Sequence, residues 1–432
     1  MATGTKSGGV LTFAEARKCV EEHASALLGG SRPGSSQCAL EDAVGRVLAE
    51  EVVADRDFPP FHRAARDGYA LRAADSGTVP AELRCAGRIR AGENYSSAVA
   101  AGECVEIMTG APVPEGADAV IMVEHTLVEH AKVEHTKVEH AKVEHAAAHG
   151  DKVLIQRSVK AGENIVPAGS EARAGSVLLK SGTRIGHREV AVLASVGKSA
   201  VAAFAVPTAA VLSTGDEVVE IETKPGPWQI RNSNAWSLAA QIRNAGAKAQ
   251  RLPVAPDEAT RLRQLIEEGL RADLLLLSGG VSMGKYDLVE TVLRELGAEF
   301  YFTGALIQPG KPVVFGKVRG KYFFGLPGNP VSTMVTFALF AKPLIDALGG
   351  APPAPLRFAQ ARLKAAVKVR PGLTRFLPGN LSGGPESPAV APAPWQGSGD
   401  IVATSRANCF LVVPPEGESF AAGTEMTVLL SE

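Results

Sequence analysis

The sequence LLLLSGGVSMGKYD runs from residue 274 to 287, and QPGKP (308–312) and YFFGLPGNPVS (322–332) follow it. Each segment holds a turn rich in Gly or Pro, and two of the turns come directly after apolar runs. Because Gly has no side chain and a following helix presents its positive end, such a turn brings bare backbone N–H groups close to an anionic ligand. The three turns together predict one pocket for a polyanion.

Apolar runs and helical patterns alternate around these turns. Continuous apolar runs predict strands at 209–212, 274–277, 300–302, 313–315 and 322–324, and apolar residues three and four apart predict helices near 237–242, 257–272, 287–296 and 331–348. Strands buried on both faces and alternating with helices predict a doubly wound, mostly parallel α/β sheet. Ligands bind such a sheet beyond the carboxyl ends of its strands, where residues 213–217, 278–282 and 325–329 are expected.

Carboxylates accompany the turns, although neither a P-loop nor a G-x-G-x-x-G motif is present. Asp216 and Glu217 follow one predicted strand and Asp287 follows another, so their oxygens could hold Mg²⁺ between substrate phosphates. The alternative interpretation makes Asp216 a turn residue and Asp287 the N-cap of the next helix. Gly279-Gly280 and Pro327-Gly328, each taken singly, would be ordinary tight turns.

The strings LSTGDE (212–217), LLSGGVSMGKYD, QPGKP and FGLPGNPVS, in this order, resemble the molybdopterin-binding domain of the molybdopterin molybdenumtransferase (MoeA) family and of its eukaryotic relative, the gephyrin E domain. RDGYA (66–70), EIMTGAPVPEGADAVIMVE (106–124) and Asn164-Ile165 with Gly169 resemble motifs of the same family outside that domain. The resemblance runs from about Phe13 to the end of the chain.

The resemblance implies an activity and a set of partners. Members of the family take adenylylated molybdopterin and molybdate, release AMP in a Mg²⁺-dependent step, and leave molybdenum on the dithiolene sulfurs. The expected partners are these two substrates, a second copy of the chain in a homodimer, the adenylyltransferase that supplies the substrate, and apo-molybdoenzymes. Neither nucleic acid nor a membrane is an expected partner.

The resemblance also implies roles for individual residues. The catalytic group would be Glu217, Asp287, Asp67, Asp216 and Ser282, of which Glu217 and Asp287 would bind Mg²⁺. Asp67 would act with Thr109 from a neighbouring domain across the dimer interface. The molybdate or pterin end would be bound by Ser332, Arg375 and Ser398. The remaining binding residues lie in the turns: Ser213, Thr214, Gly215, Ser278, Gly279, Gly280, Pro309, Gly310, Lys311, Pro327, Gly328 and Asn329.

Some positions depart from the family pattern. Gly304 and Gln308 stand where members commonly have lysines, which leaves Lys311 as the nearby cation. An acidic position of the family falls at Pro256, with Asp257 beside it. These changes leave the choice between molybdate and tungstate open, and they leave room for a weakened paralogue that binds without turnover.

The sequence offers two alternatives to the transferase function. A molybdopterin adenylyltransferase would use the same α/β domain, but the RDGYA and MTGAP segments argue against it. A scaffold protein of the gephyrin type would carry a second fused pterin-binding domain and a long linker, and this sequence has neither.

Composition narrows the class of protein. The chain has 432 residues and a formal net charge of -1, which argues against nonspecific nucleic-acid binding. Its five cysteines are odd in number and include no C-x-x-C pair, which favours reduced thiols. We expect no apolar leader and no segment of membrane-spanning length, hence a cytoplasmic protein.

The pattern also predicts how the chain is divided. Thr12 and Glu15 predict a capping box for a helix through Leu28. Residues 10–55 and 162–203 are expected to form an elongated discontinuous domain, with a small β domain inserted at 56–161. An α/β molybdopterin-binding domain is expected at 204–352 and a C-terminal β-barrel at 353–432.

Residues 123–145 contain a five-residue repeat, VEHTL-VEHAK-VEHTK-VEHAK-VEH, that has no counterpart in the family resemblance. A His-rich tract suggests metal binding. Five residues rotate a helix by about 500°, so successive imidazoles would point ~140° apart, and an odd spacing alternates faces on a strand. We therefore interpret the repeat as a solvated hairpin or loop, and expect that deleting 128–142 leaves activity intact.

Overall fold

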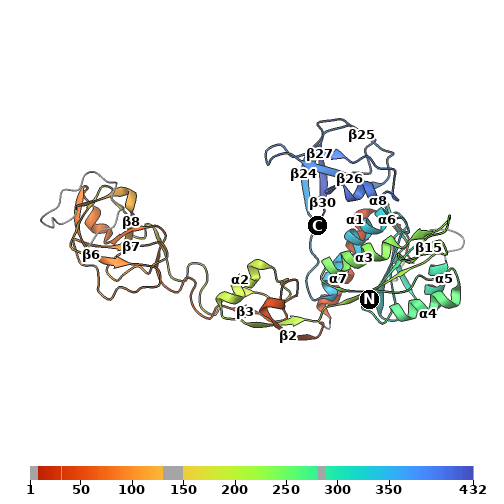
Figure 1. Ribbon diagram of the computed structural model, residues 1–432, viewed down its shortest axis with the longest axis horizontal. Helices are drawn as coiled ribbons and strands as arrows, with labels where there is room; N and C mark the ends of the chain where they lie inside the picture. The colour runs from red at the N-terminus through yellow and green to blue at the C-terminus, as the bar shows by residue number, and fades with distance from the viewer. Residues whose placement is uncertain (1–7, 31, 130–148, 281–287, 432) are drawn as a thin grey trace, which may run out of the picture. The chain divides into compact units, whose positions relative to one another are not determined.

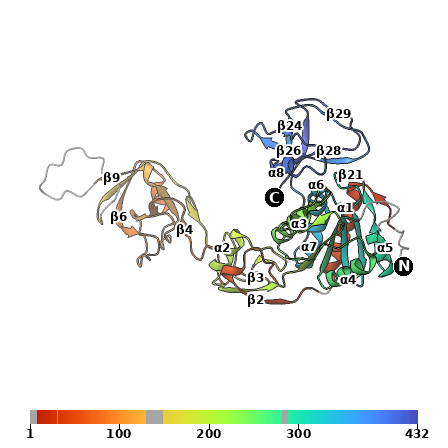
Figure 2. The same ribbon diagram turned by 45° about the vertical axis from the view of Figure 1, so that its right-hand side comes forward.

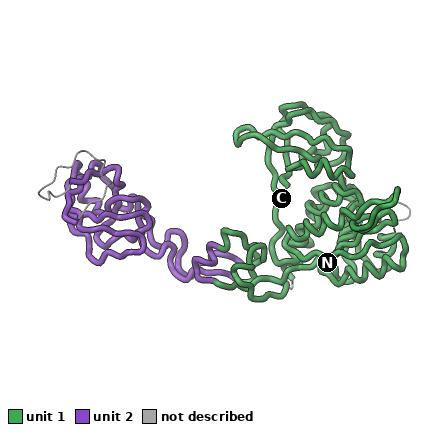
Figure 3. The backbone as a smooth tube through the Cα atoms, in the orientation of Figure 1, with its two compact units in different colours: residues 1–50, 181–190, 199–432 green, residues 51–180, 191–198 purple. Residues whose placement is uncertain are grey.

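The computed structural model describes residues 8–30, 32–129, 149–280 and 288–431. These residues form two compact units (Figure 3). Unit 1 comprises residues 1–50, 181–190 and 199–432, and unit 2 comprises 51–180 and 191–198. Each unit has its own sheets and its own hydrophobic cores.

The central sheet of unit 1 has the strand order β17-β14-β18-β23-β22-β19. β17, β14, β18 and β23 pair in parallel, and β22 pairs antiparallel with both β23 and β19. The prediction of a doubly wound, mostly parallel sheet is thus confirmed. The six strands are β14 (Thr208–Ser213), β17 (Lys248–Arg251), β18 (Leu274–Ser278), β19 (Glu299–Phe302), β22 (Val314–Val318) and β23 (Lys321–Leu326).

Helices cover both faces of this sheet (Figures 1 and 2). Because side chains alternate along a strand, Val211 packs with the helices of one face and Leu212 with those of the other. The first face carries α1 (Phe13–Gly29), α3 (Ser233–Asn244), α6 (Pro330–Thr336) and α7 (Lys342–Leu348). The second face carries α4 (Ala259–Gly269) and α5 (Leu288–Glu295).

The predicted capping box of α1 is confirmed. Thr12 Oγ1 accepts from Glu15 N at 3.3 Å, and Glu15 Oε2 accepts from Thr12 N at 2.9 Å. The two side chains thereby satisfy two of the free N–H groups at the start of the helix.

The last long helix of unit 1 is interrupted by a π-helical turn at Phe337–Ala341, between α6 and α7. The whole run, Pro330–Leu348, has 19 residues and is long enough to cross a membrane, and an 18-residue stretch of it has a mean hydropathy of 1.4. The expectation that no segment reaches that length is therefore wrong. However, 78% of that stretch is buried inside the structure, as in the core helix of a globular domain.

The C-terminal strands close into a barrel. They pair in the order β26-β27-β24-β30-β28, and β28 pairs back onto β26. A short strand of the preceding domain, β21 (Ile307–Gln308), adds to β26 in parallel. The predicted terminal β-barrel is confirmed. Its strands are β24 (Phe358–Leu363), β26 (Thr374–Ser382), β27 (Ala389–Pro392), β28 (Cys409–Val413) and β30 (Glu425–Leu430).

Unit 2 is built on a six-stranded sheet of order β8-β5-β7-β6-β10-β9, with a hydrophobic core on each face. Gly68 in the RDGYA string allows β8 to approach β5, because a Cβ at Gly68 would lie 1.8 Å from Ile121 O. The strands are β5 (Gly68–Leu71), β6 (Ala81–Ile89), β7 (Glu103–Ile107), β8 (Ala119–Met122), β9 (Thr126–Glu129) and β10 (Lys152–Ile155).

Short antiparallel pairs complete the two units. β2 (Ser35–Ala39) pairs with β13 (Ala200–Phe204) in unit 1. In unit 2, β3 (Val52–Val53) pairs with β12 (Val177–Leu179), and β4 (Arg63–Ala64) pairs with β11 (Ile165–Val166). Helix α2 spans His187–Ser195.

All five cysteines are free. Of the pentad repeat, Val123–Glu129 belongs to a short 3₁₀ turn and to β9. The rest of it, including His130, His135, His140 and His145, lies outside the described residues.

Candidate functional site

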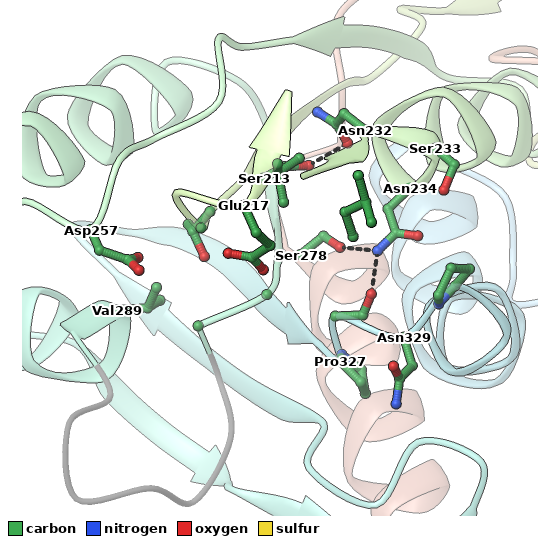
Figure 4. Close-up of a pocket in the computed structure, with 18 of the residues that line it drawn as sticks. Ser213, Glu217, Asn232, Ser233, Asn234, Asp257, Ser278, Val289, Pro327 and Asn329 are labelled. Carbon is green, nitrogen blue, oxygen red and sulfur yellow. Dashed lines mark hydrogen bonds between the residues drawn. The ribbon is translucent and has the colours of Figure 1, made fainter. Parts of the chain in front are cut away.

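A cavity of about 980 Å³ opens at the carboxyl ends of β14, β18 and β23 (Figure 4). The turns after the three strands all contribute to its wall, as the rule for doubly wound sheets requires. The predicted residues that line it are Ser213, Thr214, Gly215, Glu217, Ser278, Gly279, Gly280, Pro327, Gly328 and Asn329.

Two asparagines join the strand ends across this cavity (Figure 4). Ser213 Oγ donates to Asn232 Oδ1 at 2.9 Å, and Asn232 also caps α3 by accepting from Ala235 N. Asn234 Nδ2 donates to Ser278 Oγ at 2.9 Å and to Gly328 O at 2.7 Å. Neither asparagine was among the site residues predicted from the sequence. The signal for them is the Asn-Ser-Asn turn that precedes a helical pattern.

Positive φ angles together with close contacts favour glycine at positions 215 and 280. Gly215 has a φ of 128°, and a Cβ on it would lie 2.5 Å from the Glu217 carboxylate, which folds back over the turn. A Cβ on Gly280 would lie 2.7 Å from Thr214 Oγ1. That hydroxyl is buried and has no hydrogen-bond partner among the described residues.

Three carboxylates lie at the β14 end of the cavity. Glu217 and Asp257 line it, whereas Asp216 stands behind and accepts from Asp257 N at 3.1 Å. Burial raises the pKa of Asp257, and the negative charges of Asp216 and Glu217 raise it further. Pro256 stands where the family has an acidic residue, and its neighbour Asp257 supplies a carboxylate to the site. Asp287 and Ser282 lie outside the described residues.

A second cavity of about 300 Å³ adjoins the first and shares Pro312, Pro327 and Asn329 with it. It lies between the α/β sheet and the C-terminal barrel, where Asn329 Nδ2 donates to Ser398 Oγ at 2.9 Å and Val331 N donates to Ser398 O at 3.0 Å. The predicted residues that line it are Pro309, Gly310, Lys311, Ser332 and Ser398. Gln308, which stands where family members commonly have a lysine, lines it as well.

Arg375 stands directly behind the wall of the smaller cavity. It is only 6% exposed, and burial lowers the pKa of its guanidinium. Its Nε donates to Gln308 Oε1 at 2.8 Å, and its Nη1 donates to Leu373 O at 3.1 Å. Both acceptor residues line the cavity, so Arg375 places a buried positive charge beside it.

Asp67 and Thr109 form a hydrogen-bonded pair in unit 2. Thr109 donates to Asp67 Oδ1 from its backbone N at 2.6 Å and from Oγ1 at 2.7 Å. These bonds, the backbone one foremost, lower the pKa of Asp67. The pair therefore presents an ionised carboxylate held in one orientation.

The fold and the two adjoining cavities define an α/β protein with a ligand-sized site at the carboxyl edge of its sheet and a smaller cavity against a C-terminal barrel. Three family models match the chain in succession: the MoeA N-terminal region (domains I and II) at residues 11–197, a probable molybdopterin binding domain at 210–347, and the MoeA C-terminal region (domain IV) at 360–431. The chain belongs to the MoeA family of molybdopterin molybdenumtransferases.

Relatives and solved structures agree with this assignment. A molybdopterin molybdenumtransferase of Staphylococcus epidermidis is 31% identical over 398 residues, which cover 91% of this chain and 90% of that protein. One of Staphylococcus aureus is 31% identical over 399 residues, with the same coverage. Two structures of MoeA molybdopterin biosynthesis proteins from Pyrococcus horikoshii cover 98% of this chain and 99% or 100% of theirs. Their TM-scores are 0.66 and 0.73, at 32% and 26% identity.

Proposed function

We propose that this chain is a molybdenum-transferring enzyme of molybdenum cofactor biosynthesis, which inserts molybdenum from molybdate into adenylylated molybdopterin and releases AMP. Membership of the MoeA family supports the transfer of molybdenum to molybdopterin. The observation that carries the proposal is the pair of adjoining cavities. One is large enough for a substituted pterin nucleotide, and the other is a small polar site for an oxyanion.

The larger cavity suits a phosphorylated ligand. The turns after β18 and β23 bring backbone N–H groups to its wall, and the side chains of Ser278 and Asn234 add polar atoms. The phosphates of the substrate would lie over these turns, which hold and orient them.

The smaller cavity suits molybdate as a substrate. Lys311 supplies a cation, Ser332 and Ser398 supply hydroxyl groups, and Arg375 supplies a buried positive charge behind Gln308. Because the cavities share a wall, an oxyanion here would lie next to the end of a pterin bound over Pro327 and Asn329.

The residues at the β14 end fit a divalent cation. Two carboxylates line a cavity that must accept phosphates, so their repulsion has to be neutralised. The Thr214 hydroxyl, which has no partner among the described residues, adds a hard oxygen donor. Glu217, Asp257 and Thr214 would hold Mg²⁺, with Asp287 as proposed from the family resemblance. When bound, the ion would supply charge neutralisation for the phosphate groups.

The remaining assignments are proposals drawn from the resemblance. Asp67 and Thr109 would act on the substrate bound to a second copy of the chain, in a homodimer. The adenylyltransferase that makes the substrate and the apo-molybdoenzymes that receive the product would be transient partners, and the cytoplasm would be the compartment. The division of the chain into the four domains expected from the sequence remains part of this proposal.

A reconstitution assay tests the function. Purified protein is given adenylylated molybdopterin, molybdate and Mg²⁺, and AMP release is followed together with activation of an apo-molybdoenzyme. We expect both signals, and we expect Glu217→Ala to abolish both while the pterin still binds. Glu222→Ala, an exposed carboxylate of the same segment, is the matched control.

The same assay can contradict the proposed function. If the wild-type protein binds the pterin but releases no AMP with either molybdate or tungstate, the proposed function is wrong. A storage or carrier role for the pterin would then explain the cavities better.

A further inference from the structure

Two serines occupy matching places at the carboxyl ends of neighbouring strands. Ser213 ends β14 and Ser278 ends β18, and the two residues are register partners in the parallel pairing of these strands. Both are 3% exposed, and both line the larger cavity. A serine hydroxyl has one hydrogen to donate and two lone pairs that accept, so either serine could face an anion or a donor group. Which of the two it faces depends on its other hydrogen-bond partner.

Those partners are the two asparagines of one turn, Asn232 and Asn234, and the backbone fixes which way each amide faces. Asn232 Oδ1 accepts from Ala235 N at 3.1 Å, and a backbone N–H only donates. Asn234 Nδ2 donates to Gly328 O at 2.7 Å, and a carbonyl oxygen only accepts. In each amide a backbone group therefore distinguishes the oxygen from the nitrogen.

The two serines consequently have opposite hydrogen-bond polarity (Figure 4). Ser213 Oγ gives its hydrogen to Asn232 Oδ1 at 2.9 Å, so only its lone pairs are left for a ligand. Ser278 Oγ accepts from Asn234 Nδ2 at 2.9 Å and keeps its own hydrogen, for which no acceptor is found within the described part of the chain. Because Ser278 already accepts one hydrogen bond, its O–H is a stronger donor.

The groups around each serine have the same polarity as the serine itself. At the β14 end, the carboxylates of Glu217 and Asp257 line the cavity near Ser213, and ionised carboxylates only accept hydrogen bonds. Next to Ser278, the turn Gly279-Gly280 lines the cavity with backbone that no side chain covers. An anionic group is therefore repelled at the β14 end and stabilised at the β18 end.

We propose that Asn232 and Asn234 are positioning residues, which make Ser213 an acceptor and Ser278 a donor, and that Ser278 donates to a phosphate oxygen of the pterin substrate. Asn234 also holds the carbonyl of Gly328, so one amide orients both the serine and the turn after β23. The inference rests on the proposed function, because that function supplies a pterin that carries phosphate. Both asparagines act through the serines.

The phosphate preference of the site measures this polarity. The fluorescent oxidised pterin obtained from molybdopterin is titrated into the full-length protein, once with its phosphate monoester intact and once after a phosphatase has removed the phosphate. The ratio of the two dissociation constants is the phosphate preference. A residue that only supports the fold changes both affinities together and leaves this ratio unaltered.

The two serines should respond differently to the same substitution, although they are register partners. Ser278→Ala removes the donated hydrogen and should lower the phosphate preference by about tenfold, as for the loss of a hydrogen bond to a charged group. Ser213→Ala removes only an acceptor and should not lower the preference. Equal losses in the two variants, or a wild-type protein without a phosphate preference, overturn the proposal.

A double-mutant cycle tests whether Asn234 acts through Ser278. Asn234→Leu keeps the shape and neutrality of the side chain but has no hydrogen to donate, so the Ser278 O–H is left to turn toward Gly328 O. The phosphate preference should fall about fivefold, and it should fall little further when Asn234→Leu is added to Ser278→Ala. The matched control is Asn244→Leu, the same change at an exposed position of α3, which should leave the preference unaltered.

Additive losses in the cycle overturn the proposal, because Asn234 would then act without Ser278. If Asn234→Leu misfolds, neither pterin binds, and the smaller substitution Asn234→Ala takes its place in the same cycle. Failure of the proposed function is distinguishable, because it is read from AMP release and cofactor formation by the wild-type protein and not from the ratio of two pterin affinities.

Discussion

Arg375 Nε donates a 2.8 Å hydrogen bond to Gln308 Oε1, across the pairing of β26 with β21. The bond links the C-terminal barrel to the α/β domain at the wall of the oxyanion cavity. Gln308 is a neutral side chain in the wall of this cavity. A second cation at its position would strengthen anion binding. The charge of this cavity is therefore set by Lys311 and by a guanidinium held behind Gln308.

Gln308→Lys should raise the affinity for molybdate by roughly tenfold, since hydrogen bonds to a charged donor are worth about 1.5–3 kcal/mol. Isothermal titration with molybdate and with tungstate measures the change. Gln264→Lys adds the same charge at an exposed position of α4 and should leave both affinities unaltered. An unchanged or weaker affinity in Gln308→Lys would show that this amide does not limit oxyanion binding.

Asp257→Asn should stabilise the metal-free protein, by about 2 °C in Tm, because it removes one of three neighbouring negative charges. The folded-state pKa of Asp257 is raised above its ordinary value of 3.8, so its ionised form opposes folding. The advantage of the variant should therefore appear as pH rises through the raised pKa and should be absent at lower pH.

Thermal unfolding in EDTA between pH 3 and 8 measures this difference. Addition of Mg²⁺ should raise the Tm of the wild-type protein more than that of Asp257→Asn. An equal response to Mg²⁺ in both would remove Asp257 from the proposed set of metal ligands.

Thr109→Ala should move acid unfolding of unit 2 to higher pH. The pKa of Asp67 is lowered by two bonds from Thr109, so the pair stabilises the fold above the unfolded-state pKa and loses that contribution as pH falls through the folded-state value. Removing Oγ1 raises the folded-state pKa and leaves the backbone bond. Circular dichroism during acid titration measures the midpoint, and Thr109→Ser should match the wild type.

Gly68→Ala should destabilise unit 2 by about 3 kcal/mol or more, because the new Cβ would meet the backbone oxygen of Ile121 at 1.8 Å and β8 would have to move. Denaturant unfolding measures the loss. Gly77→Ala is the control: its Cβ would meet Ala74 O at 3.4 Å, an ordinary contact. Equal stability of the two variants would contradict the close approach of β5 and β8.

Deletion of residues 128–142 should leave the unit 2 sheet and the activity intact. The deletion removes three repeats, and Val143-Glu144 then take the sequence positions of Val128-Glu129 in β9, so its pairing with β10 is preserved. Cofactor formation in the reconstitution assay and the thermal unfolding profile check this. Loss of turnover with an unchanged unfolding profile would assign the repeat a function.

Much of the fold could be predicted because its signals are local. The apolar runs that became β14, β18 and β23 and the capping box of Thr12 and Glu15 depend on residues close together in the sequence. The π-helical turn at Phe337–Ala341 could not be predicted, since its composition is that of any buried helix.

The sequence by itself determined most of the helices and strands of the α/β domain, their order, and the three Gly- or Pro-rich turns at the candidate site. Only the tertiary structure decided which side chains meet. Asn234 reaches Gly328 across 94 residues, Arg375 reaches Gln308 across 67, and Asp257 contacts Asp216 across 41. No local pattern encodes such pairs, because they form only when parallel strands bring their carboxyl ends to one edge and the barrel docks beside it.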